Sequence, residues 1–316
     1  MIEEVFNVKL PVNEALSLKR NRFAPKELSD ATGRISIVTG IHGDELEGQY
    51  VCYLLAKWLN ENPTKIKGII DIYPSMNPMG IDSITRGFPF YDVDINRAFP
   101  GGTSDFLPGQ LAHAIVESVK GSDYAIDIHS SNIFLREIPQ VRISRSSAQE
   151  LVPLAETLGI DFIWVHDAVT VLESTFSHAM NSLGTKTLVV EMGVGMRITQ
   201  SYGEDLTQGI LNLMAKAGII EHPLNLTCKT SVSTLNSTVH FINASCAGVF
   251  IPSLEHNVLV KEGEELGQII DPLLGIVKES VLSPCDGLLF TIRDYPVVYE
   301  GSLLARLLED NAGVEA

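Results

Sequence analysis

Four short apolar runs, each ending at a turn or a glycine, constrain the fold of this chain more than any other feature. The runs are RISIVTG (34–40), GIIDIYP (68–74), DYAIDIH (123–129) and TKTLVVEMG (185–193). Between the first two, Leu46, Tyr50, Leu54 and Trp58 recur every four residues, which predicts an amphipathic helix over 45–59. Residues 34–222 are therefore expected to form an α/β sheet layered with helices.

Further helical patterns follow within the same part of the chain. They cover 110–120, 148–159 and 205–220. The second contains Pro153, which lacks a backbone N–H, so we expect this helix to begin after Pro153 or to bend there.

After residue 222 the sequence changes character. Strand-like pieces such as STVHFI, AGVFIPS, NVLVKEG, GLLFTI and SLLARLL follow at short intervals, separated by turn residues. That spacing predicts a compact all-β domain of about 90 residues. We therefore expect two domains, 1–222 and 223–316.

The amino-acid composition limits which binding partners and which cellular compartment are expected for this protein. The 316 residues carry 39 acidic against 23 basic side chains, a net charge of -16, so no basic footprint predicts binding to nucleic acid or to an anionic membrane. The four cysteines are scattered, which is typical of a reducing compartment. No export signal and no apolar run of ~20 residues is seen, so a cytoplasmic protein is expected. Composition leaves a homo-oligomer open.

The stretch GIHGDELEG places His42 and Glu45 three residues apart, at the expected entrance to the first helix. Such a pair brings two metal-ligand types to one side of a first helical turn. The alternative is an ordinary helix start with acidic residues near its positive end. A hydrolytic metal site needs a third ligand and a carboxylate that accepts a proton from water. His129 and Glu191 are candidates, because both lie at carboxyl ends of expected strands, where open α/β sheets form their sites.

Asp127 lies two residues before His129, on the same face of the expected strand. Alternation alone leaves two interpretations open: a carboxylate that orients the imidazole, or a solvated strand residue. The long segment 77–102 adds Arg86, Asn96 and Arg97. Arginine suits a carboxylate or a developing oxyanion, although surface arginines would give the same pattern.

The segments GIHGDELEG, DINRAFPG, DIHS and VVEMG, in this order, resemble the succinylglutamate desuccinylase/aspartoacylase family of the zinc carboxypeptidase clan. The resemblance implies a mixed-sheet, zinc carboxypeptidase-like α/β catalytic domain with a smaller all-β, barrel-sandwich-like domain after it. It further implies one Zn²⁺ per chain held by His42, Glu45 and His129, with Glu191 as general base and then acid. Arg86 would polarise the scissile carbonyl, and Asn96 with Arg97 would hold a substrate carboxylate.

The expected function is hydrolysis of the amide bond of a small N-acyl amino acid or a related amide. Two alternatives stay open. One is a metallocarboxypeptidase acting on short peptides. The other is a non-catalytic binding module, because VLVKEGEELGQII and VLSPCDGLLF are similar to sheets of the biotinyl/lipoyl type, with Lys278 between them but without the flanking methionines. Further contacts that select the substrate are not assigned; Arg136, Arg142, Arg197 and the C-terminal tyrosines are candidates.

Overall fold

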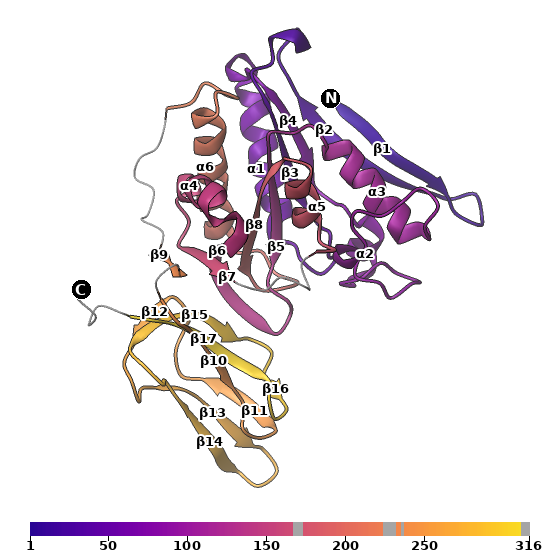
Figure 1. The fold of residues 1–316 in the computed structure, drawn as a ribbon. Helices are drawn as coiled ribbons and strands as arrows, with labels where there is room; N and C mark the ends of the chain where they lie inside the picture. Colours follow the sequence, from indigo (N-terminus) through magenta and orange to yellow (C-terminus); the bar gives the residue numbers. More distant parts are fainter. Residues whose placement is uncertain (167–172, 224–231, 235–236, 311–316) are drawn as a thin grey trace.

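A computed structural model describes residues 1–166, 173–223, 232–234 and 237–310 of the chain. Its centre is a parallel sheet in the order β4-β3-β5-β8, layered with helices (Figure 1). These are the four apolar runs of the sequence, so the α/β prediction is confirmed. The strands are β3 (Arg34–Thr39), β4 (Ile69–Tyr73), β5 (Tyr124–Ser130) and β8 (Lys186–Gly193).

Alternation along these strands separates two apolar cores on opposite faces of the sheet. Ile35, Ile37, Ile126 and Ile128 pack in one core with three helices, α1 (Glu47–Glu61), α4 (Ala148–Leu158) and α6 (Gln200–Lys216). The residues between them point to the other face. There, Val38 and Ala125 pack with α3 (Leu107–Val119) and α5 (Phe176–Ser182). The short α2 (Pro78–Ser83) lies in the long segment after β4.

Helix α4 occupies the predicted range, and of the two alternatives for Pro153 a start after the proline is wrong. The helix begins at Ala148 and runs through Pro153. Pro153 removes one intrahelical hydrogen bond, but Leu151, Ala155 and Leu158 are buried in the core beneath the helix. Tertiary burial outweighs the lost bond, as it commonly does for amphipathic helices in proteins.

Both edges of the parallel sheet receive antiparallel strands, which makes the sheet mixed, as predicted. At one edge a hairpin of β1 (Ile2–Lys9) and β2 (Ala15–Phe23), which the sequence did not predict, joins through β2 and β4. At the other edge β6 (Leu135–Ser144) pairs antiparallel with β8 and parallel with β7 (Phe162–His166).

The C-terminal region is all-β, as predicted, and consists of antiparallel strands. β15 pairs with β6, so the central sheet continues into this region through β17 and β10. A second, four-stranded sheet has the order β14-β13-β11-β16. The strands are β10 (Val239–Asn243), β11 (Gly248–Pro252), β12 (Val258–Val260), β13 (Glu265–Asp271), β14 (Ile276–Leu282), β15 (Gly287–Arg293), β16 (Val297–Val298) and β17 (Leu303–Glu309).

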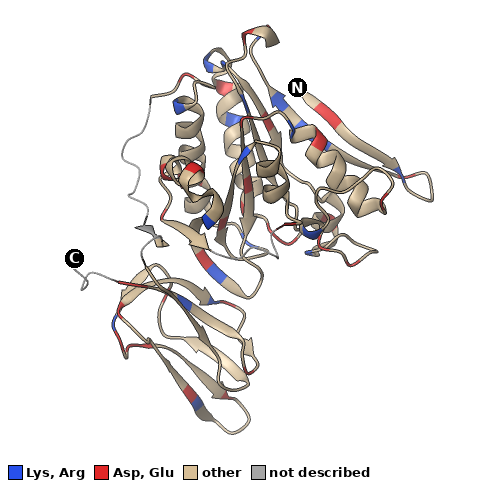
Figure 2. Ribbon diagram, viewed as in Figure 1, with Lys and Arg blue, Asp and Glu red and all other residues tan. Residues whose placement is uncertain are grey.

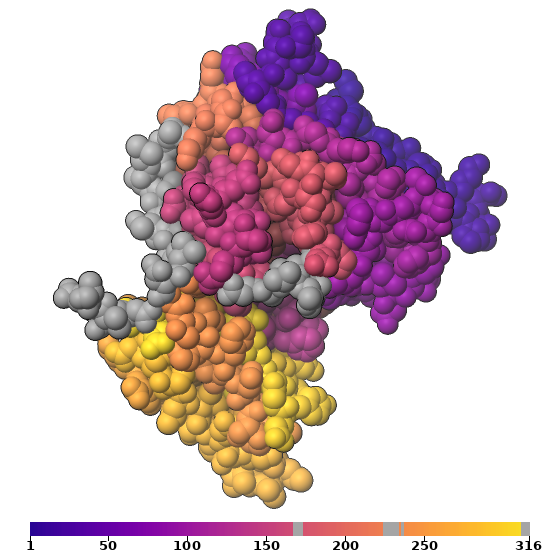
Figure 3. Space-filling view, viewed as in Figure 1, coloured from indigo at the N-terminus to yellow at the C-terminus, as the bar shows by residue number. Residues whose placement is uncertain are grey.

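The junction between the two regions is packed. Ile138 of β6 lies in a buried apolar cluster with Phe162, Phe290 and Leu308. In Figure 3 the yellow C-terminal strands lie against the magenta segment that leads into β6. The predicted boundary after residue 222 stays a prediction, because 224–231 lie outside the described residues. The two residues of β9 (Val232–Ser233) pair with β7.

Lys278 lies within strand β14, two residues beyond its start, and its ammonium donates to the carbonyl of Ala247 at 2.6 Å. The turn of that hairpin is formed by residues 272–275, between β13 and β14. The lysine is therefore not displayed at the tip, where a carrier sheet would present its modified side chain.

Charged residues are spread over many elements of both regions, with basic side chains scattered among acidic ones (Figure 2). None of the helices in the described part of the chain combines the length and apolar character that crossing a bilayer requires.

Candidate functional site

The sheet register brings predicted site residues from separate strands to one face. His129 on β5 is the direct neighbour of Glu191 on β8, so both side chains point to the face that α3 and α5 cover. His42 and Glu45 follow β3 and precede α1, which begins at Glu47. The pair thus lies in the loop before the helix rather than on its first turn, because the chain must bend there to leave the sheet.

His42, Glu45 and His129 form a compact buried cluster, each only 3% exposed. Glu45 contacts both imidazoles, with Oε1 2.8 Å from His42 Nδ1 and Oε2 2.9 Å from His129 Nδ1. The two Nδ1 atoms are 3.2 Å apart. Two nitrogens and one carboxylate that converge in this way match the donor set of a catalytic zinc site with an open position.

The outward nitrogens of both imidazoles face carboxylates. His42 Nε2 lies 3.0 Å from Asp94 Oδ1, and His129 Nε2 lies 3.1 Å from Asp127 Oδ1. Carboxylates in these positions favour the tautomer that donates from Nε2 and leaves the lone pair of Nδ1 directed at the cluster. Asp127 is 1% exposed, so the solvated interpretation of this residue is wrong.

The charges around the cluster favour a positively charged group at its centre. Burial opposes the charged form of Glu45, but His42 and His129 outweigh it and lower the pKa of this carboxyl well below its usual range. Burial likewise opposes the charged form of His129, yet Asp127 and Glu45 raise its pKa well above the ordinary value. Three carboxylates around two imidazoles therefore favour a bound cation.

The predicted arginines and Asn96 lie beside this cluster. Arg86 Nη1 donates to Glu45 Oε1 at 2.7 Å, and its guanidinium is 3.8 Å from Asp94. Asn96 is buried, and its Oδ1 accepts from the backbone N–H of Phe176, which ties the turn at 95–97 to the start of α5. Arg97 is exposed, and its guanidinium donates to the carbonyl of Asn96.

Glu191 is held by an arginine that the sequence could not single out. Arg142 Nη1 lies 3.1 Å from Glu191 Oε1. Burial raises the pKa of Glu191 above its ordinary value, and the guanidinium of Arg142 partly offsets that rise. A carboxylate with a raised pKa is suited to accept and return a proton near neutral pH.

The other unassigned candidates do not line this site. Arg136 pairs with Asp294 at 2.7 Å, and the exposed Arg197 donates to a backbone carbonyl. Tyr295 and Tyr299 are 45% and 72% exposed. Asp94, by contrast, belongs to the site. Two sequence signals could have indicated it: its place two residues before Asn96 and its position at the start of the segment DINRAFPG.

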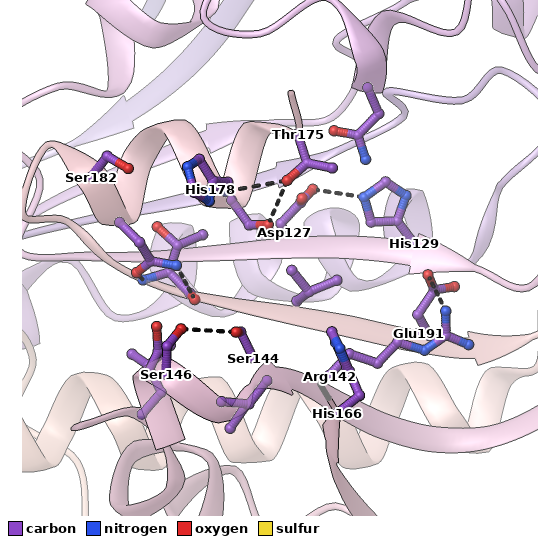
Figure 4. A pocket seen from close by; sticks show the side chains of 18 of the residues that line it. Asp127, His129, Arg142, Ser144, Ser146, His166, Thr175, His178, Ser182 and Glu191 are labelled. Carbon is purple, nitrogen blue, oxygen red and sulfur yellow. Dashed lines mark hydrogen bonds and ion pairs between the residues drawn. The ribbon is translucent and has the colours of Figure 1, made fainter. Parts of the chain in front are cut away.

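One cavity of about 460 Å³ joins these groups. Its lining includes every predicted site residue except Glu45, which is buried in contact with His42 and His129. Figure 4 shows His129 and Glu191 at one end and Ser146 and Ser182 toward the other. His178 comes from α5, and Thr175 is the residue that caps this helix. Serines and threonines from α5, β8 and the β6–α4 connection line the cavity away from His129.

Comparison with known proteins identifies the family. The model of the succinylglutamate desuccinylase/aspartoacylase catalytic domain matches residues 31–217. The chain belongs to this family. The resemblance of the sequence motifs is thus confirmed, and the family is one of hydrolytic deacylases. No curated protein matches the chain in a sequence search.

Solved structures share the fold over nearly the whole length of this chain. An aspartoacylase family protein from Mesorhizobium loti is 20% identical, with a TM-score of 0.80 over 99% of this chain and 95% of that one. The product-bound ectoine utilization protein EutE (DoeB) from Ruegeria pomeroyi is 16% identical, with a TM-score of 0.83 over 98% and 95%. A succinylglutamate desuccinylase/aspartoacylase from Rhodobacter sphaeroides is 23% identical, with a TM-score of 0.80 over 98% and 96%. At such identities the likeness concerns the fold alone.

Proposed function

We propose that this member of the family is a zinc-dependent hydrolase that cleaves the amide bond of a small N-acyl amino acid or a related amide. The convergence of His42, Glu45 and His129, with Glu191 on the same face of the next strand, carries this proposal. A bound Zn²⁺ would lower the pKa of water toward ~7 and polarise a carbonyl oxygen. The remaining chemistry belongs to side chains of this chain.

Glu191 is the proposed general base. Its raised pKa lets it take a proton from the attacking water and then deliver that proton to the departing amine. Arg86 is the proposed oxyanion partner, because its fixed positive charge lies beside Glu45 at the edge of the donor cluster. Asp94 and Asp127 would hold the two imidazoles in the ligating tautomer.

The proposed substrate carries a carboxylate held by Asn96 and Arg97. Arg86 and Arg142 each have carboxylate partners within the site. Among the arginines that line the cavity in the described residues, Arg97 is the one with no carboxylate partner. Its guanidinium is available for the planar, two-point contact that a substrate carboxylate offers.

The proposal is tested by metal analysis together with a screen of N-succinyl, N-acetyl and other N-acyl amino acids. Hydrolysis of one acyl class should be lost with a chelator and restored by zinc. Glu191→Gln should keep zinc and substrate binding but lose about 10²- to 10⁴-fold in turnover. Release of amino acids stepwise from peptides would instead favour a carboxypeptidase, and full turnover by the Gln variant would remove Glu191 from this role.

A further inference from the structure

A row of charged side chains crosses the sheet from Glu191 into the C-terminal region. Strand pairing fixes this row. Arg142 of β6 is opposite Val189 of β8, on the same face as Glu191, while Glu137 of β6 is opposite Thr291 of β15. Thr291 in turn is opposite Arg306 of β17. Residues opposite each other in adjacent strands point to the same face, so the row extends without interruption from β8 to β17.

An irregularity in β6 makes this row continuous. Glu137 and Arg142 are five residues apart, so a regular strand would point them to opposite faces. The pairing of β6 with β8 shifts by one residue between Glu137 and Gln140, at a β-bulge that contains Pro139. The extra residue reverses the alternation, which brings Glu137 and Arg142 to the same face.

The contacts along the row alternate in charge. Arg142 joins Glu191 through Nη1 at 3.1 Å and Glu137 Oε2 through Nη2 at 2.8 Å. The other oxygen of Glu137 accepts from Arg306 Nη1 and lies 3.3 Å from the hydroxyl of Thr291. Glu137 is 0% exposed. A buried carboxylate with a guanidinium on each oxygen has its charge compensated on both sides.

Aromatic rings hold the two guanidinium groups. Arg142 and Arg306 both lie over the ring of Trp164, at 5.4 and 5.3 Å from its centroid. Arg306 also lies 5.6 Å from the centroid of Phe241, its partner across β10 and β17. Contact with the rings restricts the orientation of both planar guanidinium groups, so that their N–H groups stay directed at the carboxylates of the row.

We propose that Glu137 and Arg306 are positioning residues, which hold Arg142 so that it orients Glu191. This inference rests on the proposed function of Glu191 as the base. Neither Glu137 nor Arg306 lines the cavity, whereas Arg142 and Glu191 both do. Glu137 shared between two arginines leaves Arg142 free to contact Glu191. Without Arg306, both oxygens of Glu137 draw Arg142 toward β15 and away from the base.

A contact that only joins the two regions would behave differently. Arg136 and Asp294 provide such a contact, because they also link β6 to the C-terminal region but are 40% and 37% exposed. Arg136→Met is therefore the matched control for Arg306→Met. Both variants remove a cation from the same junction and keep an unbranched side chain, but only one of them removes a member of the row.

The first measurement is a crystal structure of zinc-loaded Arg306→Met protein. The inference predicts that the contact between Arg142 and Glu191 is broken, while His42, Glu45 and His129 are unchanged. An intact contact between Arg142 and Glu191 would overturn it. This result does not require activity, so it separates failure of this inference from failure of the proposed function.

The second measurement is turnover at equal zinc content. Arg306→Met should lower kcat by about 10- to 100-fold, because small displacements of a reacting group have effects of this size. KM should stay within about twofold, since Arg306 does not line the cavity, and Arg306→Lys should recover part of kcat. Arg136→Met should retain both constants. An unchanged kcat in folded Arg306→Met would overturn the inference, because the row would then serve the structure alone.

If this variant does not fold, Glu137→Gln, which keeps the size of the side chain, is judged by the same two measurements.

Discussion

The sheet is extended at both ends, and each junction contains a buried carboxylate held by arginines. At the N-terminal hairpin, Asp71 of β4 is 0% exposed and accepts from Arg22 and Arg34 at 2.7 and 2.9 Å. At the C-terminal junction, Glu137 is equally buried between Arg142 and Arg306. The two clusters lie on the same face of the sheet and use the same ionic chemistry.

They differ in where their arginines lead. Around Asp71 the further contacts of the arginines stay outside the cavity. Arg34 donates to the carbonyls of Lys120 and Ser118, and Arg20, 3.6 Å from Asp71, donates to the carboxylate of Glu3 on β1. Around Glu137, Arg142 continues to a carboxylate in the cavity. The first cluster ends at groups outside the cavity, and the second ends at the proposed base. Buried ion pairs of one type can thus serve the fold alone or the site as well, and only the last contact distinguishes them.

The largest effect is expected on the free energy of unfolding, when the buried carboxylate of the N-terminal cluster is removed. Asp71→Ala removes the carboxylate that accepts from Arg22 and Arg34, two arginines that are largely buried, which should cost about 3–5 kcal/mol in the free energy of unfolding. The turnover of the folded fraction should be unchanged, because Asp71 lies outside the cavity. Denaturant unfolding measures the free energy of unfolding, and activity per folded molecule measures the turnover. A large loss of turnover at full folding would break the comparison.

The next largest effect is expected at low pH, in the contribution of Asp71 to the free energy of unfolding. Burial opposes ionisation of Asp71, but Arg22, Arg34 and Arg20 outweigh it and lower its pKa below the ordinary 3.8. A carboxyl whose pKa is lowered on folding contributes stability that is complete above its unfolded pKa and is lost as pH falls through the folded value. The unfolding free energy of Asp71→Asn should therefore fall less than that of the natural protein between about pH 5 and about pH 2. Parallel curves for the two proteins would contradict this.

The smallest effect is expected at the exposed pair of the C-terminal junction. Arg136→Ala should change the free energy of unfolding by at most about 1 kcal/mol, since exposed ion pairs contribute little. Thermal unfolding at low and high salt checks this value, and Glu117→Ala, which breaks the exposed pair with Lys120, serves as its reference. A clearly larger cost for Arg136 would mean that the whole junction, and not the row alone, depends on charge.

The sequence predicted the parts of this molecule that periodicity and strand ends encode. The four parallel strands follow from their apolar runs, and His129 and Glu191 meet because parallel strands bring their carboxyl ends to one edge. Glu137 and Arg306 could not be found in this way. Their meeting depends on a bulge in β6 and on pairing between β6 and β15, and neither leaves a periodic signal. Asp94 was missed because its partner, His42, is brought near only by the folding of a long loop.

The bulge in β6 also has a consequence for exchanging parts between relatives. A chimera that takes its C-terminal strands from another family member must import a cation at the place of Arg306, or the buried Glu137 keeps Arg142 as its only guanidinium partner. Deleting one residue near Pro139 would restore regular pleating and send Arg142 through to the far side of the sheet. Recombination libraries for this scaffold should therefore treat residues 137–142 and 306 as one inherited unit.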